Sequence, residues 1–497
     1  MGLLHLGVLI GSGLLAVQSI KELIKTVAQT SRYKGDIEIG IFTKPFFIIP
    51  IYLILIGISI WIYSHNPGLG LVLLLIISLL AGVPVFASLG LVGSLGLFFL
   101  LGGHFGLQQI SMISVKSLDS FTLLAIPLYI LGGQILMASG IGEDLFKVCS
   151  RWVGHLPGGA MIATIGACAV FAAISGSSVA TAATIGIIAI PEMLKRNYDP
   201  SQSYGVLAAG GTLGILIPPS AAMIIYSSVT EESTGALFIG GIIPGIILAL
   251  FFAVFAVIRC SRSGMYEKTE PSSWLERFRS LKESVWGLLA PVIVIGGIYT
   301  GIFTPTEAAA VVVVYALAVL LFSRRVSLKQ LHKVMSDGTR NSTMILLIVV
   351  GAMILGTIVT FLRVPQNLCD FVSTLHMSRW IILAILCVSY IFLGMFLEVV
   401  SILLITIPIV YPLIIQLGFN GLWFGVFVTI LMEMAMITPP VGLNLYVIQG
   451  VASTKLEQVV KGAWPYMILM LALVLILAMF PNIVTWLPGT MGYQTSF

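Results

Sequence analysis

Long apolar stretches separated by short polar connectors follow one another along almost the whole chain. Each stretch has roughly 17 to 22 residues, which at 1.5 Å rise per residue is enough for a helix to cross a hydrocarbon core about 30 Å thick. Backbone that faces lipid must satisfy its own hydrogen bonds, and a helix does so within one segment. The pattern therefore predicts an all-α polytopic membrane protein surrounded by membrane lipid.

The composition agrees with this pattern. Of 497 residues, 58% are hydrophobic and only 9% are charged, which leaves too little polar material to cover a soluble surface. The net charge is +5, and its Lys and Arg residues lie in short connectors, so no nucleic-acid partner is expected. The five cysteines are scattered without metal-ligand spacing and are interpreted as packing residues.

The basic connectors predict the orientation of the helices. Because cytoplasmic loops of membrane proteins are enriched in Lys and Arg, we assign the basic clusters to the cytoplasm. These clusters lie in residues 21–44, 147–151, 195–196, 259–282, 324–340 and 455–461. The longest polar stretch, residues 259–284, is predicted to be a cytoplasmic connector between two halves of the chain, 65–258 and 285–497.

Two stretches do not fit simple pairs of crossings. In the first, at about 158–194, two short apolar arms flank the small polar turn "SGSSVAT", and both ends are predicted to be cytoplasmic. A turn of this kind at membrane depth is tolerated only where protein or a wet cavity surrounds it. We therefore predict a re-entrant helical hairpin there, and a second one at about 380–415, where the turn is "GMFLE".

Each predicted hairpin is followed by an apolar helix that two consecutive prolines interrupt. The first, at about 205–230, contains "LGILIPPS", and the second, at about 421–452, contains "ITPPVG". Two prolines remove two N–H donors and clash with the preceding turn, so both helices are predicted to break. A single proline kink is commonly only structural. Two kinks, each paired with a polar hairpin turn, favour a binding site.

Hairpin and broken helix together form a unit that occurs twice. If the basic connectors are cytoplasmic, the first hairpin enters from the cytoplasm and the second from the opposite side. The chain is therefore predicted to contain an inverted-topology repeat. Repeats of this kind with discontinuous helices bind substrates where half-helix N-termini attract anions and freed carbonyls coordinate cations.

Oxygen atoms near the two breaks are candidates for holding Na⁺. The prolines leave the carbonyls of residues 214–217 and 435–438 without their helical donors, and bare carbonyls suit a hard cation. Side-chain oxygens complete the candidate set, namely those of Ser175, Ser177, Ser178, Ser220, Thr438 and Asn444.

Three glutamates at membrane depth require separate interpretations, because a carboxylate there is costly unless it is paired, hydrated or protonated. Glu398 in the second hairpin turn is either a ligand or gating group or a solvated turn residue. Glu307 in "TPTEA" has capping-box spacing with Thr304, so we favour a helix start over a ligand. Glu433 either lines the cavity or faces a partner helix.

An enzymatic function has little support in the sequence. The chain shows no HExxH, no GxSxG and no phosphate-binding loop. Without a nucleotide site, any pumping must use an ion gradient or the membrane potential. A channel is harder to exclude, but broken helices in inverted repeats favour a transporter with alternating access.

Seven motifs in order resemble one family, the large membrane subunit of tripartite ATP-independent periplasmic (TRAP) transporters. They are "LDSFTLLAIPLYILGG", "AAISGSSVATAATIGIIAIPEM", "GGTLGILIPPSAAMIIYS", "LFIGGIIPG", "GIFTPTEAAA", "FLGMFLE" and "ITPPVGLNLYV". The resemblance implies a subunit of a bacterial inner-membrane importer, with an elevator-type fold, that works with a small membrane subunit. It also implies that a periplasmic substrate-binding protein delivers an organic acid and that inward Na⁺ drives the uptake.

The resemblance also implies where cation and substrate bind. In the first repeat it indicates Ser175, Gly176, Ser177 and Ser178 of the hairpin with Gly214, Pro218, Pro219 and Ser220 of the break. In the second repeat it indicates Gly394, Met395 and Glu398 with Thr438, Pro439, Pro440, Gly442 and Asn444. No catalytic residue and no cofactor other than the coupling Na⁺ is expected.

Residues 1–64 precede the stretch that the motifs cover. Their two predicted helices resemble the last helix of the small subunit and the linker helix of fused permeases, or they form a two-helix extension of other origin. Fused members of the family include sialic acid importers, so sialic acid ranks slightly above dicarboxylates and other sugar acids. A similar anion transporter that needs no binding protein is the alternative function, and a membrane enzyme ranks last.

Overall fold

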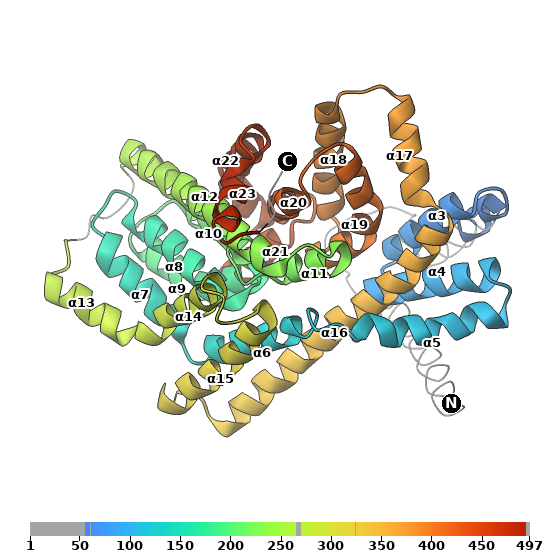
Figure 1. Cartoon of the computed structure of the whole chain (residues 1–497). Coiled ribbons are helices and arrows are strands. Elements are labelled where there is room, and N and C mark those ends of the chain that lie inside the picture. Colours follow the sequence, from blue (N-terminus) through green and yellow to red (C-terminus); the bar gives the residue numbers. More distant parts are fainter. Residues whose placement is uncertain (1–54, 60, 265–269, 324, 494–497) are drawn as a thin grey trace, which may run out of the picture. The chain divides into compact units, whose positions relative to one another are not determined.

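The computed structural model describes residues 55–59, 61–264, 270–323 and 325–493 (Figure 1). All regular secondary structure in these ranges is helical. The predicted two-helix extension, residues 1–64, lies mostly outside the described residues. The helices before the first break are α3 (Pro67–Leu80), α4 (Val85–Leu100), α5 (His104–Leu118), α6 (Ala125–Ala138), α7 (Ile141–Val153), α8 (Gly159–Ser175), α9 (Ser178–Lys195) and α10 (Pro200–Leu216).

The remaining helices run from the first break to the C-terminal segment. They are α11 (Ala221–Thr230), α12 (Thr234–Ser263), α13 (Trp274–Glu283), α14 (Val285–Tyr299), α15 (Pro305–Ser323), α16 (Leu328–Phe361), α17 (Val364–Thr374), α18 (Arg379–Gly394), α19 (Val399–Gln416), α20 (Gly421–Ala435), α21 (Leu443–Ala452), α22 (Leu456–Met479) and α23 (Asn482–Gly489).

Seven helices of the described chain are long and apolar enough to cross a membrane. The number rises to nine if each of two bent pairs is one span: α6 with α7, bent by 68°, and α13 with α14, bent by 64°. The prediction of an all-α polytopic membrane protein is therefore confirmed.

Contacts within the chain define two compact units, each assembled from segments that are distant in sequence. Unit 1 contains Met1–Ser120, Met344–Leu375 and Leu404–Leu413, and unit 2 contains Phe121–Thr343, His376–Leu403 and Ile414–Phe497. Both predicted halves, 65–258 and 285–497, contribute to each unit. The halves were inferred from a repeat and not from compactness, so they remain a prediction, as does the cytoplasmic connector 259–284.

Unit 1 packs α3, α4 and α5 with the later part of α16. Glycines allow the closest approach: a Cβ on Gly93 of α4 would lie 2.8 Å from the backbone nitrogen of Leu355. A Cβ on Gly96, one turn later, would lie 3.1 Å from Leu71 Cδ1. Small residues at such crossings let the backbones of membrane helices approach each other.

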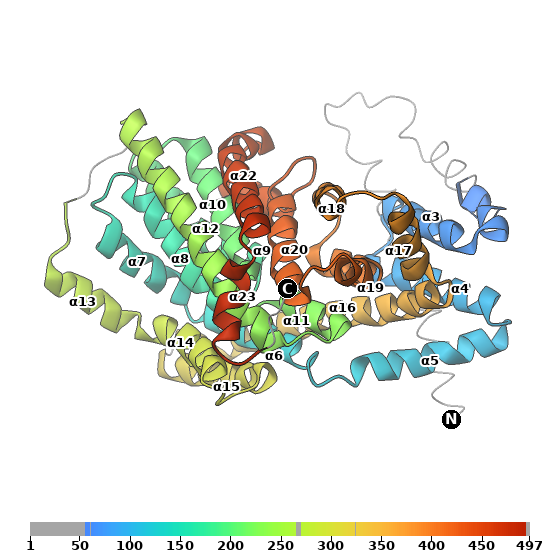
Figure 2. The ribbon, with the colours of Figure 1, turned by 45° about the horizontal axis from the view of Figure 1, so that its top comes forward.

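Unit 2 is built around the first halves of the two broken helices. Every residue of α20 is buried, and so are most residues of α10, because both helices are apolar around their whole circumference. α10 lies beside α8, α9 and α22 (Figure 2). At the crossing with α22, a Cβ on Gly205 would lie 2.1 Å from the carbonyl carbon of Gly462, so the two backbones are in direct contact.

The helices of the predicted hairpins and breaks begin and end close to the predicted bounds. The main difference is at α10, which begins at Pro200 and not near residue 205. The side chain of Asp199 caps this helix by accepting a hydrogen bond from the backbone N–H of Gln202 at 2.9 Å, and Pro200 occupies the first helical position. Both residues stand in the sequence, but the prediction started the helix only at about residue 205.

Candidate functional site

The turn between α8 and α9 holds a network of hydroxyl groups. Gly176 ends α8 with a positive φ of 59°, which favours glycine. Ser177 caps α9 by accepting a hydrogen bond from the backbone N–H of Ala180. The hydroxyl groups of Ser175 and Thr181 lie 2.9 Å apart, and Thr181 donates to the carbonyl of Ser177 at 2.8 Å. The turn is therefore rich in oxygen atoms, as the sequence predicted.

The first break, residues 217–220, separates α10 from α11. Pro218 and Pro219 have no N–H to donate, so the carbonyls of Gly214 and Ile215 lose their helical partners. No other described residue donates a hydrogen bond to these two carbonyls. Ser220, which is fully buried, caps α11 by accepting from the backbone N–H of Met223 at 3.4 Å.

The first hairpin turn lies directly against the first break. A Cβ on Gly176 would lie 2.8 Å from the carbonyl oxygen of Pro219. A Cβ on Gly214 would lie 2.5 Å from the carbonyl oxygen of Ser177. Glycine is therefore required on both sides of the contact, and the candidate residues of the first repeat form one cluster within unit 2.

The second hairpin turn likewise lies against the second break. A Cβ on Gly394, the last residue of α18, would lie 2.4 Å from the Cβ of Ala435, the last residue of α20. Met395 and Glu398 follow in the turn and are half-buried. Among the described residues none donates a hydrogen bond to the Glu398 carboxylate, so both interpretations of this residue stay open.

The second break, residues 436–442, recovers most of the hydrogen bonds that its prolines remove. The backbone N–H of Thr438 donates to the carbonyl of Ala435 at 3.0 Å, and that of Asn444 donates to the carbonyl of Met436 at 3.1 Å. The break ends at Gly442, whose φ is 55°. The peptide bonds Pro218–Pro219 and Pro439–Pro440 are both cis.

A buried polar cluster connects the first hairpin to the second broken helix. Ser178 Oγ donates to Glu433 Oε2 at 2.8 Å, and Asn444 Nδ2 donates to Ser178 Oγ at 2.6 Å. All three residues are fully buried. The sequence placed Ser178 and Asn444 in separate repeats, and the tertiary structure brings them into contact.

Glu433 is the residue that the sequence-based site omitted. Its partner Ser178 is 255 positions away, so no local pattern could pair them. The available signal was a carboxylate in an otherwise apolar helix, which is by itself a candidate functional residue. For Glu307 the interpretation as a helix start is confirmed, because its carboxylate accepts from the Thr304 N–H and hydroxyl, each at 2.8 Å, in a capping box.

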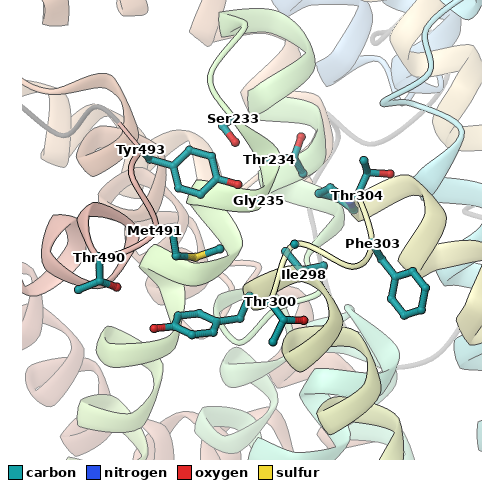
Figure 3. Close-up of a pocket in the computed structure, with 13 residues that line it drawn as sticks. Ser233, Thr234, Gly235, Ile298, Thr300, Phe303, Thr304, Thr490, Met491 and Tyr493 are labelled. Carbon is teal, nitrogen blue, oxygen red and sulfur yellow. The ribbon is translucent and has the colours of Figure 1, made fainter.

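A cavity of unit 2 lies away from these residues. It has a volume of about 620 Å³ and lies among the start of α12, the end of α14 and the C-terminal segment (Figure 3). Its lining is hydroxyl-rich and carries no charged side chain; Thr234, Thr300 and Tyr493 contribute hydroxyl groups. The predicted orientation places these helix ends on the periplasmic side. None of the predicted site residues lines the cavity.

The residues brought together offer oxygen atoms and helix N-termini but no positive side chain. Hydroxyls, bare carbonyls and one carboxylate are the ligands that hard cations prefer. The N-termini of α9 and α11, which meet where the first hairpin contacts the first break, present backbone N–H groups suited to an anion. The arrangement therefore offers oxygen ligands and backbone N–H groups at neighbouring positions.

The fold and this arrangement define a polytopic membrane protein of the transporter type. Residues 71–483 match the family of the tripartite ATP-independent periplasmic transporter, DctM component. The chain is 37% identical over 408 residues to the C4-dicarboxylate TRAP transporter large permease protein DctM of Pseudomonas aeruginosa, which covers 82% of this chain and 94% of that protein. The chain therefore belongs to the family of TRAP transporter large permeases.

Two further comparisons concern substrate and fold. The chain is 33% identical over 417 residues to the sialic acid TRAP transporter large permease protein SiaM of Vibrio cholerae, covering 84% of this chain and 97% of that protein. The YdaH transporter of Alcanivorax borkumensis has a TM-score of 0.58 at 13% identity, covering 77% and 90% of the two chains. At this identity the likeness concerns the fold alone.

Membership in this family settles the class and the location of the protein. The relatives are named as transporter permeases, so the chain is a transport protein and not an enzyme. It is a multi-pass protein of the bacterial inner membrane. The resemblance found from the motifs is thus confirmed at the level of the family.

Proposed function

We propose that this permease imports an organic acid by Na⁺ symport. The observation that carries the proposal is the contact between the first hairpin turn and the first break, where the carbonyls of Gly214 and Ile215 lack donors beside the hydroxyls of Ser175 and Ser177. In broken membrane helices, unwound backbone carbonyls of this kind coordinate Na⁺. No Lys or Arg of the described chain pairs with these oxygens, so a cation would complete their coordination.

The substrate class is proposed from the relatives and from the helix N-termini. The two relatives carry C4-dicarboxylate and sialic acid in their names, and both substrates are carboxylic acids. A carboxylate is favoured at the N-termini of α9 and α11, where backbone N–H groups and the helix dipoles attract negative charge. The proposal is therefore a small organic acid, either a dicarboxylate or a sugar acid such as sialic acid.

The proposed mechanism and partners follow from the family. The two hairpins are proposed to be re-entrant and to move with the broken helices as an elevator-type transport domain. A small membrane subunit completes the permease, and a periplasmic binding protein delivers the substrate. In this arrangement the binding protein selects the substrate, so specificity is expected to follow the binding protein supplied.

Reconstitution into liposomes tests the proposal. The permease, its small subunit and the binding protein are combined with radiolabelled dicarboxylate or sialic acid, with and without an inward Na⁺ gradient. We expect uptake only when both the binding protein and the Na⁺ gradient are present. Full-rate uptake without the binding protein would favour the alternative transporter, and full-rate uptake without Na⁺ would remove Na⁺ coupling.

Two substitutions connect this assay to the site. Ser177→Ala and Asn444→Ala are expected to raise the Na⁺ concentration needed for half-maximal uptake, because each removes a side-chain oxygen from the predicted cation region: Ser177 at the first hairpin turn and Asn444 after the second break. Folding is checked by size-exclusion chromatography. Wild-type Na⁺ activation in both variants would exclude these residues from the site.

A further inference from the structure

Glu433 lies in surroundings that normally exclude a carboxylate. Among the described residues it is the only Asp, Glu, Lys or Arg that is buried, with an exposed fraction of 0%. One carboxylate oxygen, Oε2, accepts the hydrogen bond from Ser178, while Oε1 is buried and has no hydrogen-bond partner. A charged group with half of its hydrogen bonds missing is costly in a medium of low dielectric constant.

Asn444 contributes a second oxygen without a partner to the same cluster. Its Nδ2 donates to Ser178 Oγ at 2.6 Å and to the carbonyl of Ala208 at 3.4 Å. Its Oδ1 is buried and accepts no hydrogen bond. Glu433 Oε1 and Asn444 Oδ1 are thus two buried acceptor oxygens without donors, on side chains that both contact the Ser178 hydroxyl.

No positive side chain of the described residues compensates Glu433. The helices that pack against α20 carry charged residues only near their ends. The same holds for α9, whose Ser178 donates a hydrogen bond to Glu433 of α20. These charged residues are Glu192 and Lys195 in α9, Arg259 and Arg262 in α12, Arg379 in α18, and Glu457 and Lys461 in α22. The other titratable residues on these helices and on α21 are Tyr204, Tyr226, Tyr390, Tyr446, Tyr466, Cys260 and Cys387.

The spacing along α18 and α9 keeps Arg379 and Glu192 distant from the cluster. Arg379 begins α18, whose last residue, Gly394, touches Ala435, so Arg379 is about 22 Å from that contact at 1.5 Å per residue. Glu192 lies about 21 Å along α9 from Ser178 by the same rise. The described helices around α20 therefore place no positive side chain beside Glu433.

We propose that Glu433 is the charged ligand of a Na⁺ site that it forms with Ser178 and Asn444. The ligand atoms are Glu433 Oε1, Asn444 Oδ1 and the Ser178 hydroxyl oxygen, and the remaining ligands come from backbone carbonyls or water. This site rests on the proposed Na⁺ symport and adds to it an anionic ligand that neither proline break provides.

The position of the site gives it a specific role. Ser178 begins the second arm of the first hairpin, whereas Glu433 and Asn444 stand on either side of the second break. A cation bound to all three residues ties one repeat to the other. Gly211 of α10 allows this close packing, since a Cβ there would lie 3.2 Å from Asn444 Nδ2.

Equilibrium binding of ²²Na⁺ to the purified full-length permease in nanodiscs tests the site. Glu433→Gln preserves the shape of the side chain and removes its charge. We expect this variant to bind one Na⁺ fewer per chain than the wild type, or to bind that ion at least about tenfold more weakly, as substitutions around metal sites commonly do. The Na⁺ ions bound elsewhere are expected to keep their affinity.

Thr429→Val is the matched control. Thr429 lies one turn before Glu433 on α20, is also buried, and donates only to the carbonyl of Gly425 in its own helix, at 2.8 Å. This variant is expected to bind Na⁺ as the wild type does. Equal stoichiometry and affinity in the wild type and Glu433→Gln would overturn the proposed site.

Two further results distinguish a failure of this site from a failure of the proposed Na⁺ symport. If Glu433→Gln does not yield folded protein, Ser178→Ala is measured instead, and an unchanged affinity and stoichiometry in that variant would likewise overturn the site. If the wild type itself binds no Na⁺, the proposed symport fails along with the site. If the wild type binds Na⁺ and neither Glu433→Gln nor Ser178→Ala changes the affinity or the stoichiometry, this site alone is overturned.

Discussion

The two proline breaks of unit 2 share a motif but differ in their hydrogen bonds. At the first break, the carbonyls of Gly214 and Ile215 have no donor among the described residues. At the second, Thr438 and Asn444 supply backbone donors to the carbonyls of Ala435 and Met436. The difference follows from length, because residues 436–442 form a longer loop that can fold back on itself, whereas residues 217–220 cannot.

Two helix breaks with the same pair of prolines can therefore provide different ligands. The first break offers backbone oxygen to a cation, next to a hairpin turn of hydroxyl groups. The second break supplies donors to the carbonyls of Ala435 and Met436 and has polar side chains on both sides, Glu433 before it and Asn444 after it. In the proposed transporter the two breaks are therefore complementary and not interchangeable.

The largest effect is expected where the first hairpin meets the first break. In Gly214→Ala the new methyl group would lie 2.5 Å from the Ser177 carbonyl oxygen, so the turn and the break must separate. We expect uptake in liposomes to fall about a hundredfold, as displacements of about 1 Å at a functional site can cause.

The control for this prediction comes from the second broken helix. A Cβ on Gly450 of α21 would meet no atom within 4 Å, so Gly450→Ala is expected to leave uptake unchanged. Equal uptake by Gly214→Ala and Gly450→Ala would mean that close contact at the first break is unnecessary.

The helix after the first break, α11, is capped by the side chain of Ser220, whereas α21 after the second break is preceded by Gly442 with a positive φ. Substitutions at these two positions are therefore expected to lower the stability by different amounts. Gly442→Ala forces a non-glycine residue into a positive φ, 2.9 Å from the Thr438 carbonyl oxygen, at a cost of about 1–2 kcal/mol or more. Ser220→Ala removes only the cap of α11, a loss of about 1 kcal/mol. Thermal unfolding of the purified variants measures both, and a larger loss in Ser220→Ala would contradict the comparison.

Restoring a backbone N–H donor should change the Na⁺ dependence of uptake more at the first break than at the second. Pro218→Ala restores one N–H, which can donate to the Gly214 carbonyl in a hydrogen bond of about 1 kcal/mol that competes with the cation. We expect the Na⁺ concentration for half-maximal uptake to rise about fivefold to tenfold. Pro439→Ala should change it less, because the Ala435 carbonyl already has a donor. Equal shifts in both variants would remove the proposed difference.

The smallest effect is expected outside both breaks. Thr304→Ala disrupts the capping box with Glu307 at the start of α15, at a cost of about 0.5–1 kcal/mol in thermal stability. The Na⁺ dependence of uptake should not change. A shifted Na⁺ dependence in this variant would instead make Glu307 part of the cation site.

Much of the fold could be predicted because the signals are local. Apolar length predicts membrane helices, and Pro218 with Pro219 predicts the end of α10 through the loss of two donors. The hairpin turn at Gly176 follows from small residues, and Thr304 with Glu307 has the spacing of a capping box. Each of these features depends on residues within a few positions of one another.

The candidate site could be predicted only in part. Ser178 and Asn444 were selected because they stand beside a turn and a break, which are local features. Glu433 was left between two interpretations, because nothing near it in sequence identifies the group it contacts. The start of α10 was also missed, since Asp199 and Pro200 fit equally well in a polar connector.

The sequence alone determined the membrane class, the family, the two breaks and the hydroxyl-rich turn. Proline chemistry and apolar length act along the chain and need no distant partner. Only the tertiary structure decided that the first break keeps bare carbonyls while the second recovers donors, and that Glu433 lies 2.8 Å from a serine 255 positions away. Burial and hydrogen bonding between distant segments depend on how the helices pack, which no local pattern encodes.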